Sequence, residues 1–221
     1  MTRNNAAMPD LFDAMRGDHT EIIADGAVIL HGFALDAAAE LLAAVDAIAA
    51  QAPFRHMLVP SGHSMSVAIT NCGSAGWVSD RKGYRYDRFN PDSGRPWPSL
   101  PACFLALALR AADAAGYGGF APDACLINCY VPGARVSLHQ DKNERDFSAP
   151  IVSVSLGLPA TFLFGGLWRT DRAVRFRLSH GDVAVWGGAS RMAFHGIAPL
   201  KPGAHPLAGE RRINLTFRKA L

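Results

Sequence analysis

Residues 212–218 read Arg-Ile-Asn-Leu-Thr-Phe-Arg, a strict alternation of polar and apolar side chains over seven positions. Successive side chains on a β-strand point to opposite faces, so the polar members share one face: Arg212, Asn214, Thr216 and Arg218. Alternation alone is typical of an edge strand with one solvated face. Two arginines on that face also suit a socket for a dicarboxylate, because a guanidinium presents paired donors that fit a carboxylate.

Short apolar runs upstream of this stretch predict further strands. They are rich in β-branched and aromatic residues, and Gly, Pro, Asp or Asn separates them. The runs are Val28–Leu30, Cys125–Tyr130, Ile151–Leu156, Thr161–Phe164, Val174–Leu178 and Val183–Trp186. Because no helical pattern interrupts those after residue 120, we expect a two-sheet jelly roll over about residues 120–219.

Two helices are expected ahead of these strands. Asp36 is placed to cap a helix that continues to about Gln51, where Pro53 would stop it. A second helix follows Ser99 and ends at Gly116, and its apolar residues recur at helical spacing, so that one face should cover a sheet. The predicted class is therefore mainly β with flanking helices (α+β).

Length and composition favour one domain over residues 1–221, with a loosely held lead-in up to about Thr20 and the fold proper from about Ala27. The four cysteines form no CxxC pair, and the N-terminus carries no apolar stretch of signal-peptide length. No apolar run is long enough to span a membrane. These features lead us to expect a cytoplasmic protein without a membrane role. A net charge of +3 does not by itself identify a partner.

A candidate metal site begins at His139-Gln140-Asp141. Ligands two residues apart on extended backbone project to the same side, and His195 can supply a third ligand from a later strand. Two histidines and one carboxylate form the facial triad of non-heme Fe(II), which leaves open positions for a cosubstrate and O2. The motif also arises by chance, and a zinc hydrolase could use the same ligands with water in the fourth place.

Asn128 and Tyr130 repeat the two-residue spacing and direct an amide and a phenol to one side of their strand. They could hydrogen-bond within the core, or they could complete a polar socket beside the metal together with the arginines of residues 212–218.

Residues 54–97 form a stretch that the predicted core does not need. The stretch contains Trp77 and, at residues 81–88, the run Arg-Lys-Gly-Tyr-Arg-Tyr-Asp-Arg, which has four cations and two tyrosines. Cations suit phosphates and aromatic rings suit bases, so the stretch is interpreted as a nucleotide-recognition lid. A solvated hairpin is the alternative.

The ordered set of motifs resembles that of the AlkB family over roughly residues 10–219. The matching motifs are Asn128-x-Tyr130, Pro132-Gly133, His139-x-Asp141, His195 and Arg212-x-Asn214-x-Thr216-x-Arg218. The resemblance implies a double-stranded β-helix (jelly-roll) core that uses Fe(II), 2-oxoglutarate and O2. It also implies oxidative demethylation of N-alkylated bases in DNA, with RNA as a further substrate, and release of formaldehyde.

The resemblance assigns a role to each residue of the site. His139, Asp141 and His195 would hold the iron. The distal carboxylate of 2-oxoglutarate would be taken by Arg212, Asn214 and Tyr130, and the end that chelates the metal would be supported by Arg218 and Asn128.

A methylated base cannot be reached while it is stacked, so the substrate would be single-stranded or flipped into a pocket. By the same resemblance, Trp77 and His139 would sandwich the base, Tyr84 would bind the phosphodiester, and Arg169 would reach the pocket mouth. Asn143 departs from the family pattern, which tends to have an acidic residue there, and an amide cannot balance the charge of a cationic lesion. The preference among lesions is therefore expected to differ. A monomer would suffice.

Two alternatives stay open from the sequence. A 2-oxoglutarate oxygenase could instead act on a protein or a small molecule, although the basic aromatic stretch argues against it. A cupin-like metal-binding module or a zinc hydrolase could share the sandwich and the ligands, but it would have no use for the polar face of residues 212–218.

Overall fold

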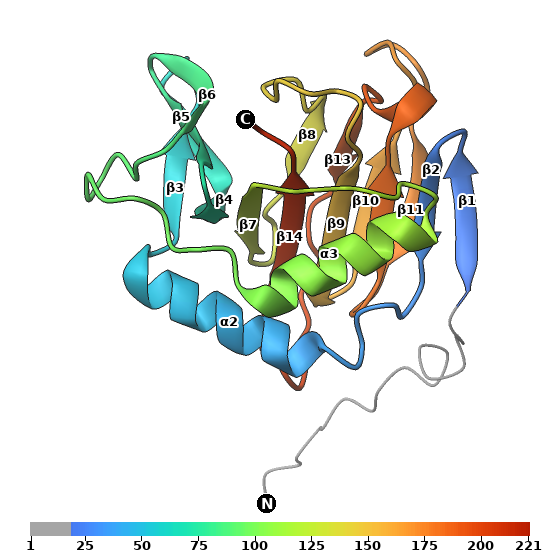
Figure 1. The fold of residues 1–221 in the computed structure, drawn as a ribbon, viewed down its shortest axis with the longest axis horizontal. Coiled ribbons are helices and arrows are strands. Elements are labelled where there is room, and N and C mark those ends of the chain that lie inside the picture. The colour runs from blue at the N-terminus through green and yellow to red at the C-terminus, as the bar shows by residue number, and fades with distance from the viewer. Residues whose placement is uncertain (1–18) are drawn as a thin grey trace, which may run out of the picture.

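The computed structural model of the protein describes residues 19–221, and antiparallel sheets dominate its regular structure (Figure 1). The large sheet contains, in spatial order, β1 (Thr20–Ala24), β2 (Ala27–Leu30), β12 (Val183–Trp186), β9 (Ile151–Gly157), β14 (Arg212–Arg218), β7 (Ala124–Tyr130), β4 (Ser64–Gly73) and β3 (Arg55–Leu58). The small sheet contains β11 (Val174–Leu178), β10 (Ala160–Phe164), β13 (His195–Ile197) and β8 (Val136–His139). A separate hairpin joins β5 (Gly76–Asp80) to β6 (Gly83–Asp87).

Two helices, α2 (Ala38–Gln51) and α3 (Ala102–Ala114), lie along one face of the large sheet (Figure 1). Both bury one apolar stripe, which joins the outward side chains of the sheet in a single core cluster. The helix ends agree with the sequence prediction to within two or three residues. The predicted cap is wrong, however: Ala37 occupies the N-cap position without a side-chain hydrogen bond, and Asp36 is exposed.

β14 lies in the middle of the large sheet, hydrogen-bonded to β9 on one side and β7 on the other. Its apolar side chains join the helix-side core, where the Phe217 ring meets Phe104 edge-on at 5.9 Å. Each such side chain contributes roughly 1.5–3 kcal/mol on burial. Its polar side chains face the interior between the two sheets, so all seven residues are buried. The edge-strand interpretation is therefore wrong, and the shared polar face is confirmed.

Several strands were not predicted. β1 begins at Thr20, ahead of the predicted start of the fold, and the rest of the predicted lead-in lies outside the described residues. The idea that the core does not need residues 54–97 is wrong for β3 and β4, because β4 pairs with β7 over residues 68–73 and extends the large sheet. The predicted class, mainly β with two helices and a jelly-roll core, is confirmed. Within residues 19–221, no helix has the length and apolar character needed to cross a membrane.

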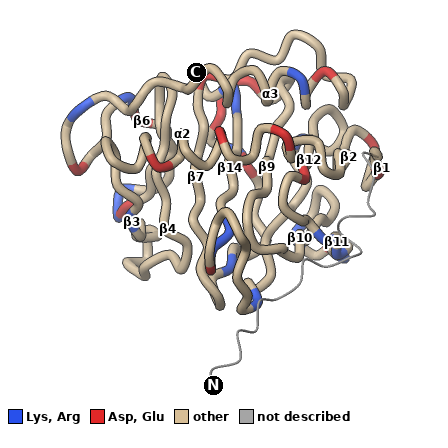
Figure 2. Tube along the Cα trace, turned by 90° about the horizontal axis from the view of Figure 1, so that it is seen from below, with Lys and Arg blue, Asp and Glu red and all other residues tan. Residues whose placement is uncertain are grey.

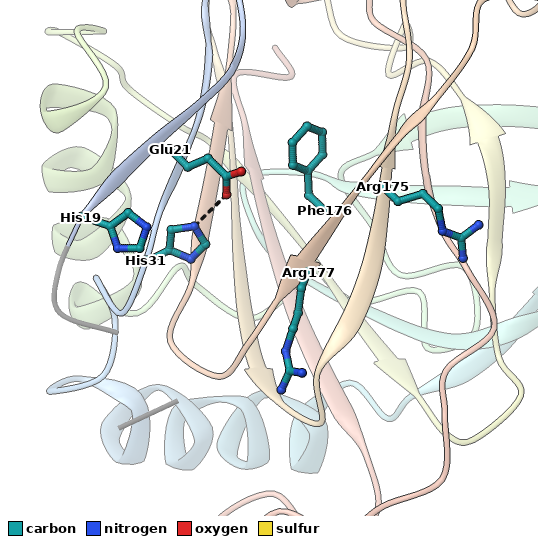
Figure 3. A pocket seen from close by; sticks show the side chains of 6 residues that line it. All are labelled: His19, Glu21, His31, Arg175, Phe176 and Arg177. Atoms are coloured by element: carbon teal, nitrogen blue, oxygen red, sulfur yellow. Dashed lines mark hydrogen bonds and ion pairs between the residues drawn. The ribbon is translucent and has the colours of Figure 1, made fainter. Parts of the chain in front are cut away.

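A buried carboxylate fixes the β1–β2 hairpin to the turn before β12. Asp182 accepts hydrogen bonds from the backbone N–H groups of Gly32 (2.9 Å) and Ser179 (2.7 Å), and its Oδ2 lies 3.2 Å from His31 Nδ1. The other ring nitrogen of His31 lies 2.9 Å from Glu21 Oε2, beside a cavity of about 350 Å³ between β1, β2 and β11 (Figure 3). The Asp182 carboxylate is thus contacted by two backbone N–H groups and by the His31 ring.

We predict that Asp182→Asn lowers the free energy of unfolding by about 3 kcal/mol, because an amide group would set its own N–H groups against buried donors. Urea denaturation followed by circular dichroism measures the change. Asp36→Asn, at an exposed site that caps no helix, should change stability by less than about 0.5 kcal/mol. Equal stabilities for the Asp182 variant and the parent protein would contradict this account.

Candidate functional site

Three potential metal ligands meet where the small sheet faces the large one. His139 ends β8 and His195 begins β13, and the two residues are direct partners in the antiparallel register. Asp141 follows two residues after His139. One ligand atom from each residue lies within 4.8 Å of the others, and Asp141 carboxylate oxygens are 3.6 Å from His139 Nε2 and 3.7 Å from His195 Nε2. The structure therefore brings the predicted triad together.

The backbone sets the orientation of both imidazoles. His139 Nδ1 lies 3.0 Å from the carbonyl oxygen of Ser137, and His195 Nδ1 lies 3.0 Å from that of Ala193. A carbonyl only accepts hydrogen bonds, so each Nδ1 must carry the proton and each Nε2 presents a lone pair toward Asp141. This arrangement is the one that a divalent metal ion requires of neutral histidine ligands.

The charges around the triad favour the deprotonated, metal-binding forms. Burial would raise the pKa of Asp141, but the guanidinium of Arg218 and the two imidazoles outweigh it and hold that pKa well below its usual range. Burial, helped by the neighbouring His139, lowers the pKa of His195 to about 4. At neutral pH, Asp141 is therefore a deprotonated carboxylate and His195 is a neutral imidazole, which are the forms that bind a metal ion.

Arg218 anchors Asp141 from the large sheet. Its Nη2 and Nε donate to Asp141 Oδ2 at 2.6 and 2.9 Å, and both residues are buried. The sequence assigned Arg218 to the metal-chelating end of 2-oxoglutarate, but its observed contact is with the carboxylate of the triad. The pair fixes one ligand by a charge-assisted bond to a central strand.

A buried polar network missed by sequence reasoning surrounds this pair. Glu144 accepts from the Tyr86 hydroxyl (2.7 Å) and from Arg191 Nη2 (3.2 Å), and its other contact is Arg218 at 3.5 Å. Arg191 also donates to the backbone oxygen of Asp141 at 2.8 Å. The network connects β6 of the separate hairpin to the triad. In the charged run of residues 141–146, nothing distinguishes the buried Glu144 from its solvated neighbours.

Arg212 presents unsatisfied donors inside the pocket. Its side chain is only 1% exposed, and Nη2 donates to Ser155 Oγ at 2.9 Å. Within residues 19–221, Nε and Nη1 have no hydrogen-bond partner. The guanidinium carbon lies 4.9 Å from the centre of the Tyr130 ring, and burial lowers the pKa of Arg212. A buried cation with free donors fits an anionic ligand, since leaving such donors unpaired is costly.

The two asparagines of the polar face differ in availability. Asn214 donates both amide N–H groups, to Ser153 Oγ (2.8 Å) and to the Val154 oxygen (3.0 Å), and its own oxygen accepts from Thr216 (3.0 Å) and Asn128 (3.3 Å). In this arrangement Asn214 has no spare donor for a carboxylate. Its side chain instead orients Asn128, which also borders the pocket.

One cavity of about 740 Å³ is lined by the triad and by the five residues predicted to bind the cosubstrate. The four residues predicted to bind the substrate also line it: Trp77, Tyr84, Asn143 and Arg169. The rings of Trp77 and Tyr84 stack at 5.5 Å, and the Trp77 indole donates to Asn143 Oδ1 at 3.1 Å. Arg169 lines the cavity, with its guanidinium carbon 5.9 Å from the centre of the Phe194 ring. The cavity is therefore large enough for a cosubstrate and a base together.

The positive charge of residues 81–88 is weaker than the sequence suggests. Arg85 forms a two-point ion pair with Asp80 (3.1 and 2.9 Å) and lies 3.7 Å from Asp87. The hydrogen bonds with Asp80 raise the pKa of Arg85. Figure 2 shows basic and acidic residues interspersed along the chain instead of gathered on one face. The exposed cations of this hairpin are Arg81, Lys82 and Arg88.

Comparison with known proteins finds close relatives of the whole chain. The family model described as the 2OG-Fe(II) oxygenase superfamily matches residues 26–218. The chain is 56% identical over 213 residues to the alpha-ketoglutarate-dependent dioxygenase AlkB of Salmonella typhimurium, covering 96% of this chain and 98% of that protein. It is 58% identical over 200 residues to the protein of that name from Escherichia coli, covering 90% and 93%. The solved structure of OsALKBH1 matches with a TM-score of 0.80 and 28% identity, covering 91% of this chain and 100% of that one.

We predict that His195→Ala weakens Co(II) binding at least about 100-fold, since loss of a ligand should exceed the 10–100-fold effect typical of groups that only support ligands. Calorimetric titration of the metal-free protein measures the affinity. His56→Ala is the matched control, because His56 is exposed on β3 and lies outside the cavity. An unchanged affinity in the His195 variant would remove this residue from the metal site.

Proposed function

The chain belongs to the 2OG-Fe(II) oxygenase superfamily, and on that basis we propose that it is an AlkB-type enzyme that demethylates N-alkylated nucleic-acid bases by oxidation. The observation that carries the proposal is the juxtaposition of two features in one cavity: a His-Asp-His ligand set and the buried, partly unpaired Arg212. A zinc hydrolase would need the first feature but not the second.

His139, Asp141 and His195 would hold Fe(II), which their donor atoms and proton positions fit. Bound iron would supply the oxidising chemistry that couples 2-oxoglutarate decarboxylation to methyl hydroxylation, after which formaldehyde leaves the base. Arg218 holds the Asp141 carboxylate in place for this ligand set. The protein contributes positioning and charge, and no nucleophilic side chain is required.

Arg212 and Tyr130 form the end of the cavity that would receive the distal carboxylate of 2-oxoglutarate. Free N–H groups at Nε and Nη1 can form a charge-assisted pair with that group. Asn128, oriented by Asn214, lies closer to the triad along the polar face and can donate to the end of the cosubstrate that faces the metal.

The substrate base would enter from the side of the β5–β6 hairpin, and we assign residues 54–97 as the nucleotide-recognition lid. A base flipped out of a strand can lie between Trp77 and His139, which border the same cavity. Tyr84 and Arg169 are at its mouth, where a phosphodiester would pass. DNA is the proposed substrate, with RNA as a second. A monomer suffices, because every residue assigned here comes from one chain.

We predict formaldehyde release from an oligonucleotide that contains N1-methyladenine only when Fe(II) and 2-oxoglutarate are both present. Arg212→Lys keeps the charge but removes the paired donors, so the KM for 2-oxoglutarate should rise about 10- to 100-fold. A fluorimetric formaldehyde assay with varied 2-oxoglutarate measures both effects. Turnover that ignores 2-oxoglutarate would exclude an oxygenase, and turnover confined to peptides or small molecules would exclude a nucleic-acid demethylase.

Arg211→Lys is the matched control for this assay. Arg211 adjoins Arg212 in sequence, but it lies on the helix side, where Nη2 donates to Asp46 at 3.4 Å. The control should leave the KM for 2-oxoglutarate within about twofold of the parent value. A similar rise in both variants would show that the effect does not come from a specific carboxylate pair.

We further predict that Asn143→Asp changes the preference among lesions. The indole of Trp77 can donate to either side chain at residue 143, so the geometry should persist while a negative charge is added. Charge-assisted bonds are about twice as strong as neutral ones, so kcat/KM should rise about fivefold for cationic N1-methyladenine relative to neutral N3-methylthymine. Competition between the two oligonucleotides in one reaction measures the ratio. An unchanged ratio would show that residue 143 does not sense the charge of the base.

A further inference from the structure

Trp168 exposes more of its surface than any other aromatic side chain in residues 19–221. Its side chain is 75% exposed, whereas Trp97 and Trp186 are buried and Trp77 is half-buried. Indole is costly to leave in water, and soluble domains usually bury most of it. A single exposed side chain needs no partner, but Leu167 beside it is also exposed, and adjacent exposed apolar side chains are a feature of binding surfaces.

Trp168 adjoins the lining of the site cavity in sequence. The next residue, Arg169, lines the cavity, and the preceding residue, Leu167, is also exposed. Gln140 lies between His139, which ends β8, and Asp141, and its amide donates to the backbone oxygens of Leu167 (3.4 Å) and Met192 (2.6 Å). The turn that carries Trp168 is thus tied directly to the wall that holds the triad.

The turn is held firmly, so the exposure of Trp168 does not come from a loose loop. The backbone N–H of Trp168 donates to Asp171 Oδ2 at 2.9 Å, and Asp171 N–H donates back to the Trp168 oxygen at 3.0 Å. Phe194 N–H donates to the Gly166 oxygen at 2.8 Å. Asp171 also packs directly against Gly166, where any side chain would collide with it, so the turn is tight.

The chemistry of the turn suits one kind of partner. Asp171 directs its carboxylate to the backbone of the turn, and the exposed residues of the turn include an indole and two cations, Arg169 and Arg172. Single-stranded nucleic acids bind to such surfaces, because bases stack on aromatic rings and phosphates meet the cations. In the proposed function, Trp77 stacks on the target base, so Trp168 can stack on a different base of the same strand.

We propose that Trp168 is a stacking platform for a base next to the target nucleotide on the substrate strand. The inference rests on the proposed function and adds to it a second contact, outside the catalytic cavity, that a lone nucleotide cannot make. It makes the enzyme sensitive to the length of the substrate.

The test compares two substrates that carry the same methylated base: a 10-mer oligonucleotide and the corresponding nucleoside 5′-monophosphate. Trp168→Ala should raise the KM for the 10-mer on the order of 10-fold with little change in kcat, because a stacking contact is lost. The KM for the mononucleotide should change less than about twofold. Trp168→Phe should restore most of the 10-mer affinity. Leu207→Ala, at another exposed apolar side chain (57%) outside the cavity, is the matched control and should match the parent.

Four results would overturn the inference. The 10-mer KM could be unchanged in Trp168→Ala, or both substrates could be affected equally, which would indicate a disturbed cavity. Sedimentation could instead show that the parent protein self-associates and that Trp168→Ala does not, with no effect on the 10-mer, so that the partner is a second copy of the chain. If the parent turns over neither methylated substrate, the proposed function fails, and fluorescence anisotropy with a labelled 10-mer still decides: equal affinities for parent and Trp168→Ala would exclude stacking.

Discussion

The site depends on two guanidinium groups buried on one face of a central strand. A cation cannot remain inside a protein without a compensating anion or a full set of acceptors. On β14, Arg218 meets this requirement with Asp141 and Glu144, which ties the central strand of the large sheet to a ligand carried by the small sheet. Arg212 meets it only in part, through Ser155. The first pair positions a carboxylate of the candidate metal site, and the unpaired donors of the second fit the carboxylate of the proposed cosubstrate. Both arginines are buried because β14, whose polar and apolar side chains alternate, lies between β7 and β9 in the large sheet.

The ion pair at Arg218 also extends beyond the triad. Tyr86, on the separate hairpin, shares Glu144 with Arg191 and lies 3.4 Å from Arg218 Nη1. Burial raises the pKa of Tyr86 far above the usual range, so its hydroxyl remains a donor at any physiological pH. The hairpin that presents Trp77 and Tyr84 is therefore attached to the same charged network that orients Asp141. A continuous set of hydrogen bonds and ion pairs thus joins the hairpin to the Asp141 carboxylate.

Much of this arrangement could be predicted from the sequence. The period of two in residues 212–218 predicted which side chains share a face, and the spacing of His139 and Asp141 predicted converging ligands. Other features depend on partners far along the chain. β4 belongs to the large sheet because it pairs with β7, and β3 pairs with the other edge of β4, neither of which the local pattern reveals. Glu144 and Arg191 look like surface charges until the fold buries them together. Arg85 looks free to bind phosphate, yet Asp80 neutralises it. Propensity and periodicity describe single elements, whereas charge pairing is a property of the assembled molecule.

The backbone carbonyls that hold the two triad histidines have a consequence for how the protein acquires its ion. Each imidazole is oriented by the carbonyl of a residue two positions earlier in the chain, so its direction is set by the backbone and not only by a bound ion. Loss of an ion should therefore leave the sheets intact. A ligand set of two nitrogens and one oxygen can bind Mn(II), Fe(II), Co(II) or Ni(II). The order of their affinities is a property of the ions and not of the site. The metal supply would then decide which ion fills the site, and nickel or cobalt in place of iron would stop the proposed oxidation without unfolding the protein.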